Sequence, residues 1–291
     1  MMEYITLQNT DLRVSRFCMG GCPMGGYGWG SVQESELLDA VHAALDAGVN
    51  FFDTADTYGL GQSERTLAKG LGSRRRDVVI ESKFGVRVGG GKTIYDNSPE
   101  YIQQALEESL RRLNTDYIDV YLIHYRDGKT PIADVVGKLE ELLPYAGRFA
   151  CCQDELSLAC RKNEDDLRAV QSRLRATPMT WGSLGQGILT GKYNRENVCF
   201  GADDRRSREI YVNFHGEKLE QNLRIVEALK KIAANREKSV AACAIRWILD
   251  TLPESVVIAG VKRPAQLSAN VEAMGWTLNE EELRELNEVS E

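Results

Sequence analysis

Four ionisable side chains stand at or just beyond the C-terminal ends of predicted strands. Asp53 ends the second strand, Lys83 ends the third and His124 ends the fourth, and Tyr58 follows closely after Asp53. A tyrosine with an ordinary pKa of about 10 is a weak acid at neutral pH. A lysine that is held by an aspartate would stabilise its phenolate, and His124 could then orient a carbonyl oxygen. These residue types predict proton donation to a carbonyl at one site.

The elements that would carry these side chains alternate between strand and helix. The strands lack hydrophobic alternation, as strands buried on both faces do, and amphipathic stretches follow them. A hairpin is expected over 4–14, and strands are predicted to start near residues 16, 48, 77, 117, 148, 177 and 256. Helices are predicted over 32–47, 63–71, 98–113, 132–143, 163–174, 217–235, 240–249, 262–273 and 280–289. This rhythm favours a parallel α/β sheet.

A single (β/α) barrel of the TIM type, with the hairpin at its N-terminus, fits this order best. No Pro-rich or Ser-rich linker divides residues 1–291, so we expect one domain. A barrel commonly takes about 250 residues, and the C-terminal ends of its strands meet around one mouth. Asp53, Lys83 and His124 would therefore converge. The alternative is an open, doubly wound sheet.

Four motifs in order resemble those of the bacterial-type aldo-keto reductase family. They are Phe52–Gly59, Ser82–Lys83, Asp119–His124 and Gly187–Lys192. The resemblance runs nearly end to end, and it implies a (β/α)₈ barrel that binds NADPH without a Rossmann domain and reduces aldehydes or ketones. By motif position Tyr58 would be the general acid. Lys83 and Asp53 would tune its pKa, and His124 would position the carbonyl.

The resemblance also implies a cofactor site. Trp181 would stack on the nicotinamide, and Gln153 would hydrogen-bond its carboxamide. The other residues implied for the cofactor are Gly20, Gly21, Gly182, Leu184, Gln186, Gly260, Lys262, Arg263, Gln266 and Asn270. Lys262 and Arg263 would place positive charge at a helix start, which is a favourable place for a 2′-phosphate. NADPH is therefore favoured over NADH.

One strand and helix unit is missing from this series. Only seven strand starts are found, and the tract between His124 and Phe149 holds a single helix, although a unit needs on the order of 30 residues. By resemblance, Leu139–Leu142 should lead into a fifth strand ending in a Ser-Asn pair that holds the carboxamide, yet the chain passes straight to Leu143–Arg148. A real deletion, an altered chain or an omitted segment would each give this sequence. Losing a strand predicts either a re-registered barrel or a gap with exposed strand edges.

Composition excludes several other classes of protein. The net charge of −7 argues against a nucleic-acid partner, which needs a basic face. The seven cysteines include no Cys-x-x-Cys pair and no zinc-ligand spacing, so we expect the protein to bind no metal. We also expect a cytoplasmic protein whose thiols are reduced. No apolar run approaches the length of a membrane span, and the start of the chain lacks a signal-peptide pattern. Nothing in the sequence indicates an oligomeric state.

The loops around the mouth give weaker signals. Val86–Thr93 resembles a phosphate-binding P-loop, but Val86 stands where that motif requires glycine. We therefore expect a mobile loop bordering the mouth. Tyr27, Trp29 and Tyr125 indicate an apolar or aromatic rim for the substrate, whose identity the sequence does not give.

The function that these residues predict is an NADPH-dependent reductase of small carbonyl compounds. An alternative is an NADPH-binding sensor or interaction protein of the same fold with little or no turnover, which the absence of the Ser-Asn segment supports. A phosphosugar isomerase or lyase on a similar barrel is a third hypothesis, but it would not need Lys262 and Arg263 at a helix start.

Overall fold

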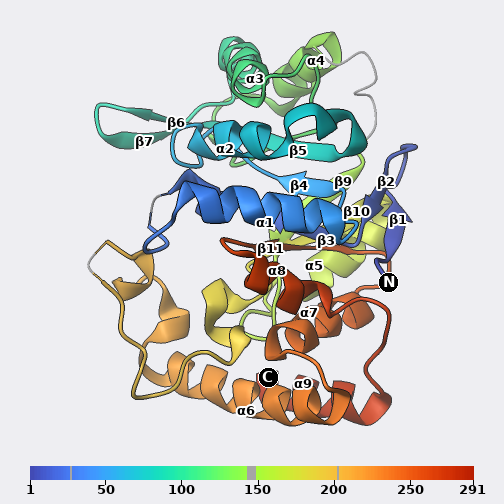
Figure 1. The fold of residues 1–291 in the computed structure, drawn as a ribbon. Helices are drawn as coiled ribbons and strands as arrows, with labels where there is room; N and C mark the ends of the chain where they lie inside the picture. The colour runs from blue at the N-terminus through green and yellow to red at the C-terminus, as the bar shows by residue number, and fades with distance from the viewer. Residues whose placement is uncertain (27, 143–148, 202) are drawn as a thin grey trace.

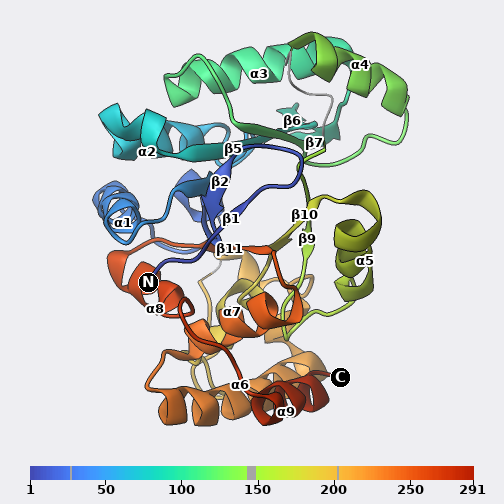
Figure 2. The ribbon, with the colours of Figure 1, turned by 90° about the vertical axis from the view of Figure 1, so that its right-hand side faces the viewer.

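A sheet of seven parallel strands forms the centre of the computed structural model, which describes residues 1–26, 28–142, 149–201 and 203–291. The strands are β3 (Phe17–Gly20), β4 (Phe51–Asp53), β5 (Val79–Phe84), β8 (Val120–Ile123), β9 (Cys151–Glu155), β10 (Thr177–Trp181) and β11 (Val256–Gly260). They pair in the order β8-β5-β4-β3-β11-β10-β9. The sheet curves around a common interior, with helices outside it (Figures 1 and 2). The expected TIM-type α/β fold is confirmed.

The helices follow the strands as the sequence predicts. They are α1 (Glu34–Asp46), α2 (Gln62–Leu71), α3 (Pro99–Leu113), α4 (Ile132–Leu142), α5 (Glu164–Ala169), α6 (Gly216–Arg236), α7 (Val240–Thr251), α8 (Pro264–Val271) and α9 (Glu280–Ser290). Short helical turns occupy Cys22–Gly25, Gly72–Asp77, Val170–Leu174, Gly185–Thr190, Arg205–Ser207 and Val212–Phe214. At the start of α3 the Ser98 hydroxyl accepts the Tyr101 N–H and proline occupies the first turn, which stabilises that helix end.

The sheet does not close into a barrel among the described residues. β8 pairs with β5 and β9 pairs with β10, and no described strand joins β8 to β9. Seven strands are therefore described instead of eight, and β8 and β9 do not pair with each other as they would in a re-registered barrel. The junction expected at 143–148 lies outside the described residues.

Two antiparallel hairpins flank the sheet. The expected N-terminal hairpin is formed by β1 (Tyr4–Thr6) and β2 (Arg13–Ser15). The second hairpin, β6 (Val86–Gly89) and β7 (Lys92–Tyr95), replaces the mobile loop expected at 86–93. Gly90 and Gly91, which join its strands, both have positive φ, at 58° and 75°. Two glycines in that conformation favour a tight hairpin turn, so these glycines form the turn that joins β6 to β7.

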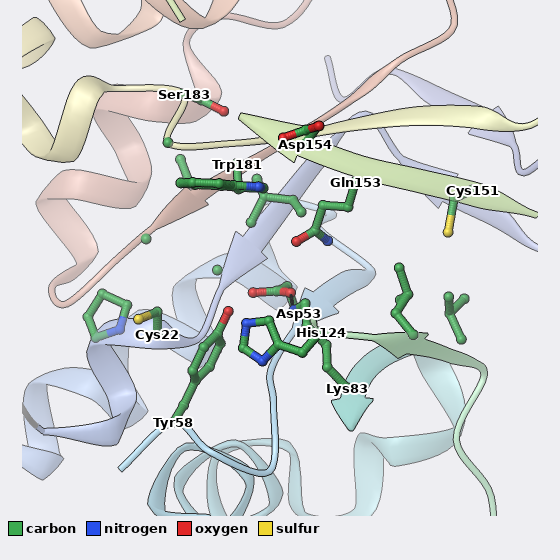
Figure 3. A pocket seen from close by; sticks show the side chains of 18 of the residues that line it. Cys22, Asp53, Tyr58, Lys83, His124, Cys151, Gln153, Asp154, Trp181 and Ser183 are labelled. Carbon is green, nitrogen blue, oxygen red and sulfur yellow. Dashed lines mark hydrogen bonds and ion pairs between the residues drawn. The ribbon is translucent and has the colours of Figure 1, made fainter. Parts of the chain in front are cut away.

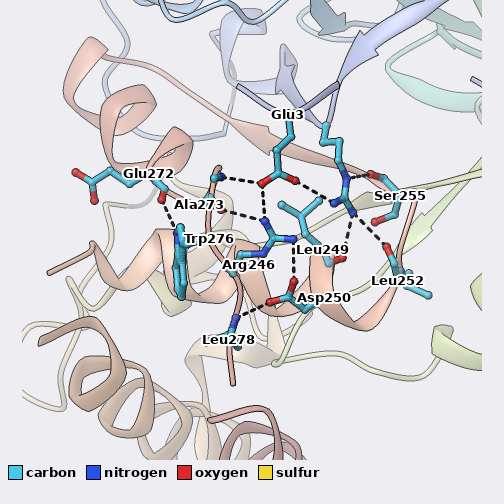
Figure 4. Close-up of polar contacts among 12 residues, drawn as sticks. Glu3, Arg246, Leu249, Asp250, Leu252, Ser255, Glu272, Ala273, Trp276 and Leu278 are labelled. Carbon is cyan, nitrogen blue, oxygen red and sulfur yellow. Dashed lines mark hydrogen bonds and ion pairs between the residues drawn. The ribbon is translucent and has the colours of Figure 1, made fainter. Parts of the chain in front are cut away.

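A network of ion pairs ties the N-terminus to α7 (Figure 4). Glu3 Oε1 accepts from Arg246 Nη1 at 2.9 Å and from the Gly275 N–H at 2.7 Å, while Oε2 accepts from Arg16 Nη1 at 3.2 Å. The Arg246 side chain is only 3% exposed and also contacts Asp250. Burial works to raise the pKa of Glu3, but the Gly275 N–H and the two arginines outweigh it and lower that pKa.

We expect Glu3→Gln to lower the free energy of unfolding by about 1–3 kcal/mol at neutral pH, because it leaves the charge of buried Arg246 only partly compensated. A carboxylate whose pKa is lowered by folding stabilises the folded state above its unfolded pKa and loses that effect as the pH falls through the folded pKa. The difference between Glu3→Gln and the parent should therefore shrink in acid. Urea unfolding at several pH values measures it.

The matched control is Glu227→Gln, which removes an ion pair with Lys230 whose side chains are 67% and 42% exposed. This change should cost less than about 0.5 kcal/mol. Equal effects of the two substitutions would contradict the structural importance of Glu3.

Candidate active site

A cavity of about 2060 Å³ opens at the carboxyl ends of the parallel strands. Asp53, Tyr58, Lys83 and His124 all line it, although they come from three strands and a loop. The lining also includes Leu122 and other residues of β8 together with residues of β9, so the cavity extends between the two edge strands. The convergence expected from the strand ends is therefore observed.

A buried ion pair forms the floor of this site. Lys83 on β5 donates to the carboxylate of Asp53 on β4, and it also donates to the Thr54 carbonyl oxygen at 3.0 Å. Both side chains are less than 5% exposed. Burial works against the charged lysine, but the negative charge of Asp53 outweighs it and raises the Lys83 pKa well above its usual value. Lys83 is therefore a permanent cation of the site.

Tyr58 is held in a tight turn directly after β4. Its N–H donates to the Ala55 carbonyl oxygen at 3.2 Å, and its own carbonyl oxygen accepts the Ser63 N–H. Gly59 follows with φ of 59°, and a Cβ there would lie only 2.0 Å from the Gly25 carbonyl oxygen. Only glycine lets this loop pack so closely against residues 22–25.

The Tyr58 hydroxyl stays protonated at neutral pH. Burial raises its pKa well above the usual value and Asp53 adds to the rise, while Lys83 works to lower it. The Lys83 Nζ lies 5.2 Å from the centre of the Tyr58 ring. Lys83 thus acts in the direction expected from the sequence, but it does not dominate the pKa of Tyr58.

His124 stands beside Tyr58 at the end of β8, with ring centres 5.6 Å apart and the rings nearly perpendicular. The backbone N–H of His124 donates to the Phe84 carbonyl oxygen at 2.7 Å, which fixes the backbone of His124 to β5. Burial and the charge of Lys83 lower the His124 pKa to about 4. The imidazole is therefore neutral at neutral pH, and its buried Nδ1 has no hydrogen-bond partner among the described residues.

Trp181 and Gln153 enter the cavity from the other arm of the sheet (Figure 3). Trp181 ends β10 with 38% of its surface exposed. Gln153 on β9 donates through Nε2 to Glu81 Oε1 at 2.5 Å. Tyr58 and His124 lie across the cavity from the indole, so the space between them is bounded by an aromatic ring on one side and a hydroxyl on the other.

The far end of the cavity is positively charged. Lys192, Arg205, Arg206 and Lys262 line it. Lys262 donates to the Trp29 carbonyl oxygen at 2.7 Å. Burial lowers the Lys262 pKa, and the charges of Arg206 and Arg263 lower it further. Crowded cations of this kind are suited to an anionic group.

Most of the residues predicted for cofactor binding line the cavity. They are Gly20, Gln153, Trp181, Gly182, Leu184, Gln186, Gly260, Lys262, Gln266 and Asn270. The lining formed by the described residues includes neither Gly21 nor Arg263. Gly21 donates its N–H to the Asp53 carbonyl oxygen at 2.7 Å and so supports β4, whereas Arg263 pairs with Glu36 at the surface.

The sequence prediction did not single out Glu81 or Arg206. Glu81 stands two residues before Lys83 on the same strand, so the two side chains share a face. That spacing of two residues could have predicted that Glu81 lies in the same interior as Lys83. Arg206 lies in the short helical turn Arg205–Ser207 within a long loop, where it donates to Tyr193 and pairs with Asp204. Nothing in a single sequence indicates that such a loop folds over the cavity.

The family model described as the Aldo/keto reductase family matches residues 16–144 and 146–291. The chain belongs to this family. Members of the family are oxidoreductases that use nicotinamide cofactors. The family that the four sequence motifs implied is thus confirmed.

Similar proteins cover nearly the whole chain. "Aldo-keto reductase YhdN" of Bacillus subtilis is 31% identical, over 100% of this chain and 94% of the relative. "NADH-specific methylglyoxal reductase" of Escherichia coli is 28% identical, over 100% of this chain and 99% of the relative. The solved structure of the glycerol dehydrogenase AKR11B4 from Gluconobacter oxydans has a TM-score of 0.88 at 31% identity, covering 98% and 94% of the two chains.

Other features of the described residues bear on the expectations from composition. All seven cysteines are free thiols. The described side chains include no group of three His, Cys, Asp or Glu that could hold a metal ion. None of the described helices has both the length and the apolar character needed to span a bilayer.

We expect the His124 ring to remain neutral down to about pH 5, because burial and the Lys83 cation disfavour its protonated form. Nuclear magnetic resonance of ring-labelled protein tests this, since the chain has only three histidines. The signal that disappears in His124→Asn should keep the chemical shift of a neutral imidazole through that range. A midpoint above about pH 6 would contradict the electrostatic description of the site.

Proposed function

We propose that this chain is an NADPH-dependent reductase that converts small aldehydes or ketones to alcohols, acting as a single domain over residues 1–291. The observation that carries the proposal is the meeting of a protonated Tyr58 and a neutral His124 above the buried ion pair of Lys83 and Asp53. A proton donor and a neutral hydrogen-bond donor side by side suit a carbonyl oxygen that gains negative charge.

The residues of the cavity fit a nicotinamide dinucleotide. Trp181 offers a flat apolar surface near Tyr58, and Gln153 offers an amide on the same side. Lys262 and Arg206 supply positive charge at the other end, where phosphates would lie. Because the segment with the implied Ser-Asn pair is missing, Gln153 is the side chain left to hold the carboxamide.

Each step of the proposed reaction has a residue in place. A nicotinamide cofactor, when bound, would supply the hydride that reduces the carbonyl carbon. Trp181 would hold one face of its ring and shield that face from water. Tyr58 donates its phenolic proton to the carbonyl oxygen, and neutral His124 positions that oxygen through a ring N–H. Lys83 lowers the cost of the phenolate that Tyr58 becomes, because its positive charge lies close to the ring.

The mouth favours a substrate with an apolar or aromatic part. Tyr125 lines the cavity, is about half exposed and stacks with His124 at a distance of 4.9 Å between ring centres. Trp29 lines the cavity, whereas Tyr27 lies outside the described residues. We place the enzyme in the cytoplasm, where its free thiols would stay reduced.

Tyr58→Phe should reduce the rate of carbonyl reduction by about 10²- to 10⁴-fold, because it removes the proton donor. NADPH consumption with a nitrobenzaldehyde measures this rate. Tyr95→Phe is the matched control, since it removes a hydroxyl from the exposed hairpin, and it should change the rate little. Full activity in Tyr58→Phe would show that the assignment is wrong.

A sensor or interaction protein remains the second candidate, and the open gap between β8 and β9 is the observation that favours it. The cofactor side of the sheet has lost a neighbouring strand there. Fluorescence titration with NADPH, combined with turnover measurements, separates the two functions. Tight binding without reduction of any carbonyl tested would favour the sensor, and turnover would favour the reductase.

Lys262→Met should raise the Kd for NADPH by about tenfold or more, because it removes a charge-assisted contact to the 2′-phosphate. The Kd for NADH, which lacks that phosphate, should change little. Arg263→Ala should have a smaller effect, because Arg263 is exposed and paired with Glu36. Fluorescence titration with both dinucleotides measures these constants, and parallel losses for the two would contradict a role in NADPH preference.

A further inference from the structure

Glu81 is a buried carboxyl in the active-site interior that the proposed reaction does not use. It lies on β5 with no exposed surface. Side chains alternate along a strand, so Glu81 and Lys83 face the interior while Ser82 faces outward and donates to Glu64 of α2. The register places Glu81 beside Asp53 of β4.

One oxygen of Glu81 contacts both halves of the site. Oε1 accepts from Gln153 Nε2 at 2.5 Å and lies 3.5 Å from Lys83 Nζ. Oε2 has no hydrogen-bond partner among the described residues. Lys83 is thus shared by two carboxyls, Asp53 and Glu81, in a place from which water is largely excluded.

Burial raises the Glu81 pKa to about 8, with Lys83 opposing the rise and Asp53 adding to it. The other titratable groups of the described residues that face this interior are Asp53, Tyr58, Lys83, His124, Cys18 of β3, Cys22 and Cys151 of β9. Burial raises the pKa of the three thiols. Burial lowers the His124 pKa to about 4. Within this set, the raised pKa of Glu81 places its change of charge in mildly alkaline solution.

We propose that Glu81 is a positioning residue that keeps Tyr58 protonated in alkaline solution and thereby biases this site towards carbonyl reduction and against alcohol oxidation. The proposal rests on the function proposed above. Reduction needs the phenol of Tyr58 as an acid, whereas the reverse reaction needs its phenolate as a base. When Glu81 releases its proton to solvent, the new negative charge offsets part of the Lys83 charge that stabilises the phenolate. Tyr58 then holds its proton to higher pH.

The coupling has a defined sign. Below the pKa of Glu81 its carboxyl is neutral, and Lys83 with Asp53 forms a balanced pair. Above that pKa the three groups carry one excess negative charge, which opposes a further negative charge on Tyr58. The ionisation of either Glu81 or Tyr58 therefore makes ionisation of the other less favourable. Glu81 is the stronger acid and ionises first.

Glu81→Gln tests the proposal, because glutamine keeps the shape and can still accept from Gln153 but cannot become negative. Reduction and oxidation rates are measured from about pH 6 up to the most alkaline pH at which the parent stays folded. Below about pH 7 the variant should match the parent. At higher pH the alkaline loss of reduction, and the onset of oxidation, should both move down by about one pH unit, which is a tenfold change in the ionisation of Tyr58.

A second readout needs neither cofactor nor turnover. The ultraviolet absorbance of phenolate is followed against pH in protein pairs that differ only by Tyr58→Phe, so that the difference reports Tyr58 alone. Tyr58 should ionise at lower pH in Glu81→Gln than with Glu81 present. If Glu81→Gln does not fold, Glu81→Met removes the same charge at similar volume and should give the same shift.

Asp56→Asn is the matched control. Burial raises the Asp56 pKa to about 7, so it titrates in a similar range, but its Oδ2 accepts from Tyr101 of α3. Removal of the Asp56 carboxyl should leave unchanged the pH at which reduction is lost and the pH at which oxidation begins. Unchanged pH values in Glu81→Gln, or a shift in Asp56→Asn instead, would overturn the role of Glu81 while the reductase assignment stands. A parent that reduces no carbonyl at any pH would overturn both.

Discussion

The buried ion pair between Lys83 and Asp53 is the interaction on which the rest of the site depends. Removing two charges from water costs several kcal/mol per ion unless they are paired and further hydrogen-bonded. Here the Thr54 carbonyl oxygen accepts a second hydrogen bond from Lys83, and adjacent parallel strands hold both backbones. The loop that carries Tyr58 bonds back to β5 through the Asp56 N–H and the Lys83 carbonyl oxygen. Tyr58, the proposed proton donor, is thus placed by the same two strands as the charges beneath it.

The strands that position these side chains remain paired with one another although the described sheet is incomplete. β8, β5, β4 and β3 are consecutive neighbours, and together with the loop after β4 they carry His124, Lys83, Asp53 and Tyr58. The gap borders β8, the strand that ends just before His124, and separates it from β9. Gln153 on β9 and Trp181 on β10 belong to the other arm of the sheet. The residues of the proposed proton transfer therefore lie on paired neighbouring strands, and the gap lies between β8 and the strands that carry Gln153 and Trp181.

Glu81 joins these two arms across the interior, where β8 and β9 are not paired. Its carboxyl reaches from β5 to the amide of Gln153, and it also contacts Lys83. A buried polar group without a partner destabilises the fold, so this contact fixes the amide of Gln153 as well as satisfying one oxygen of Glu81. Protonation of one carboxyl is thereby linked to both the acid and the cofactor side of the proposed reaction.

The sequence by itself determined the order of strands and helices, the family, the lost unit and the residues at the strand ends. Those features are local: apolar runs, cap residues and motif spacing act over a few residues, and a lysine at the end of a buried strand points to the mouth of any such barrel. The tertiary structure decided whether the sheet would close, that Gly90 and Gly91 form a hairpin turn, and that Arg206 faces the cavity while Arg263 faces solvent. These outcomes depend on contacts between segments distant in the chain. Burial, which sets the protonation of Tyr58, His124 and Glu81, likewise exists only once those segments have packed together.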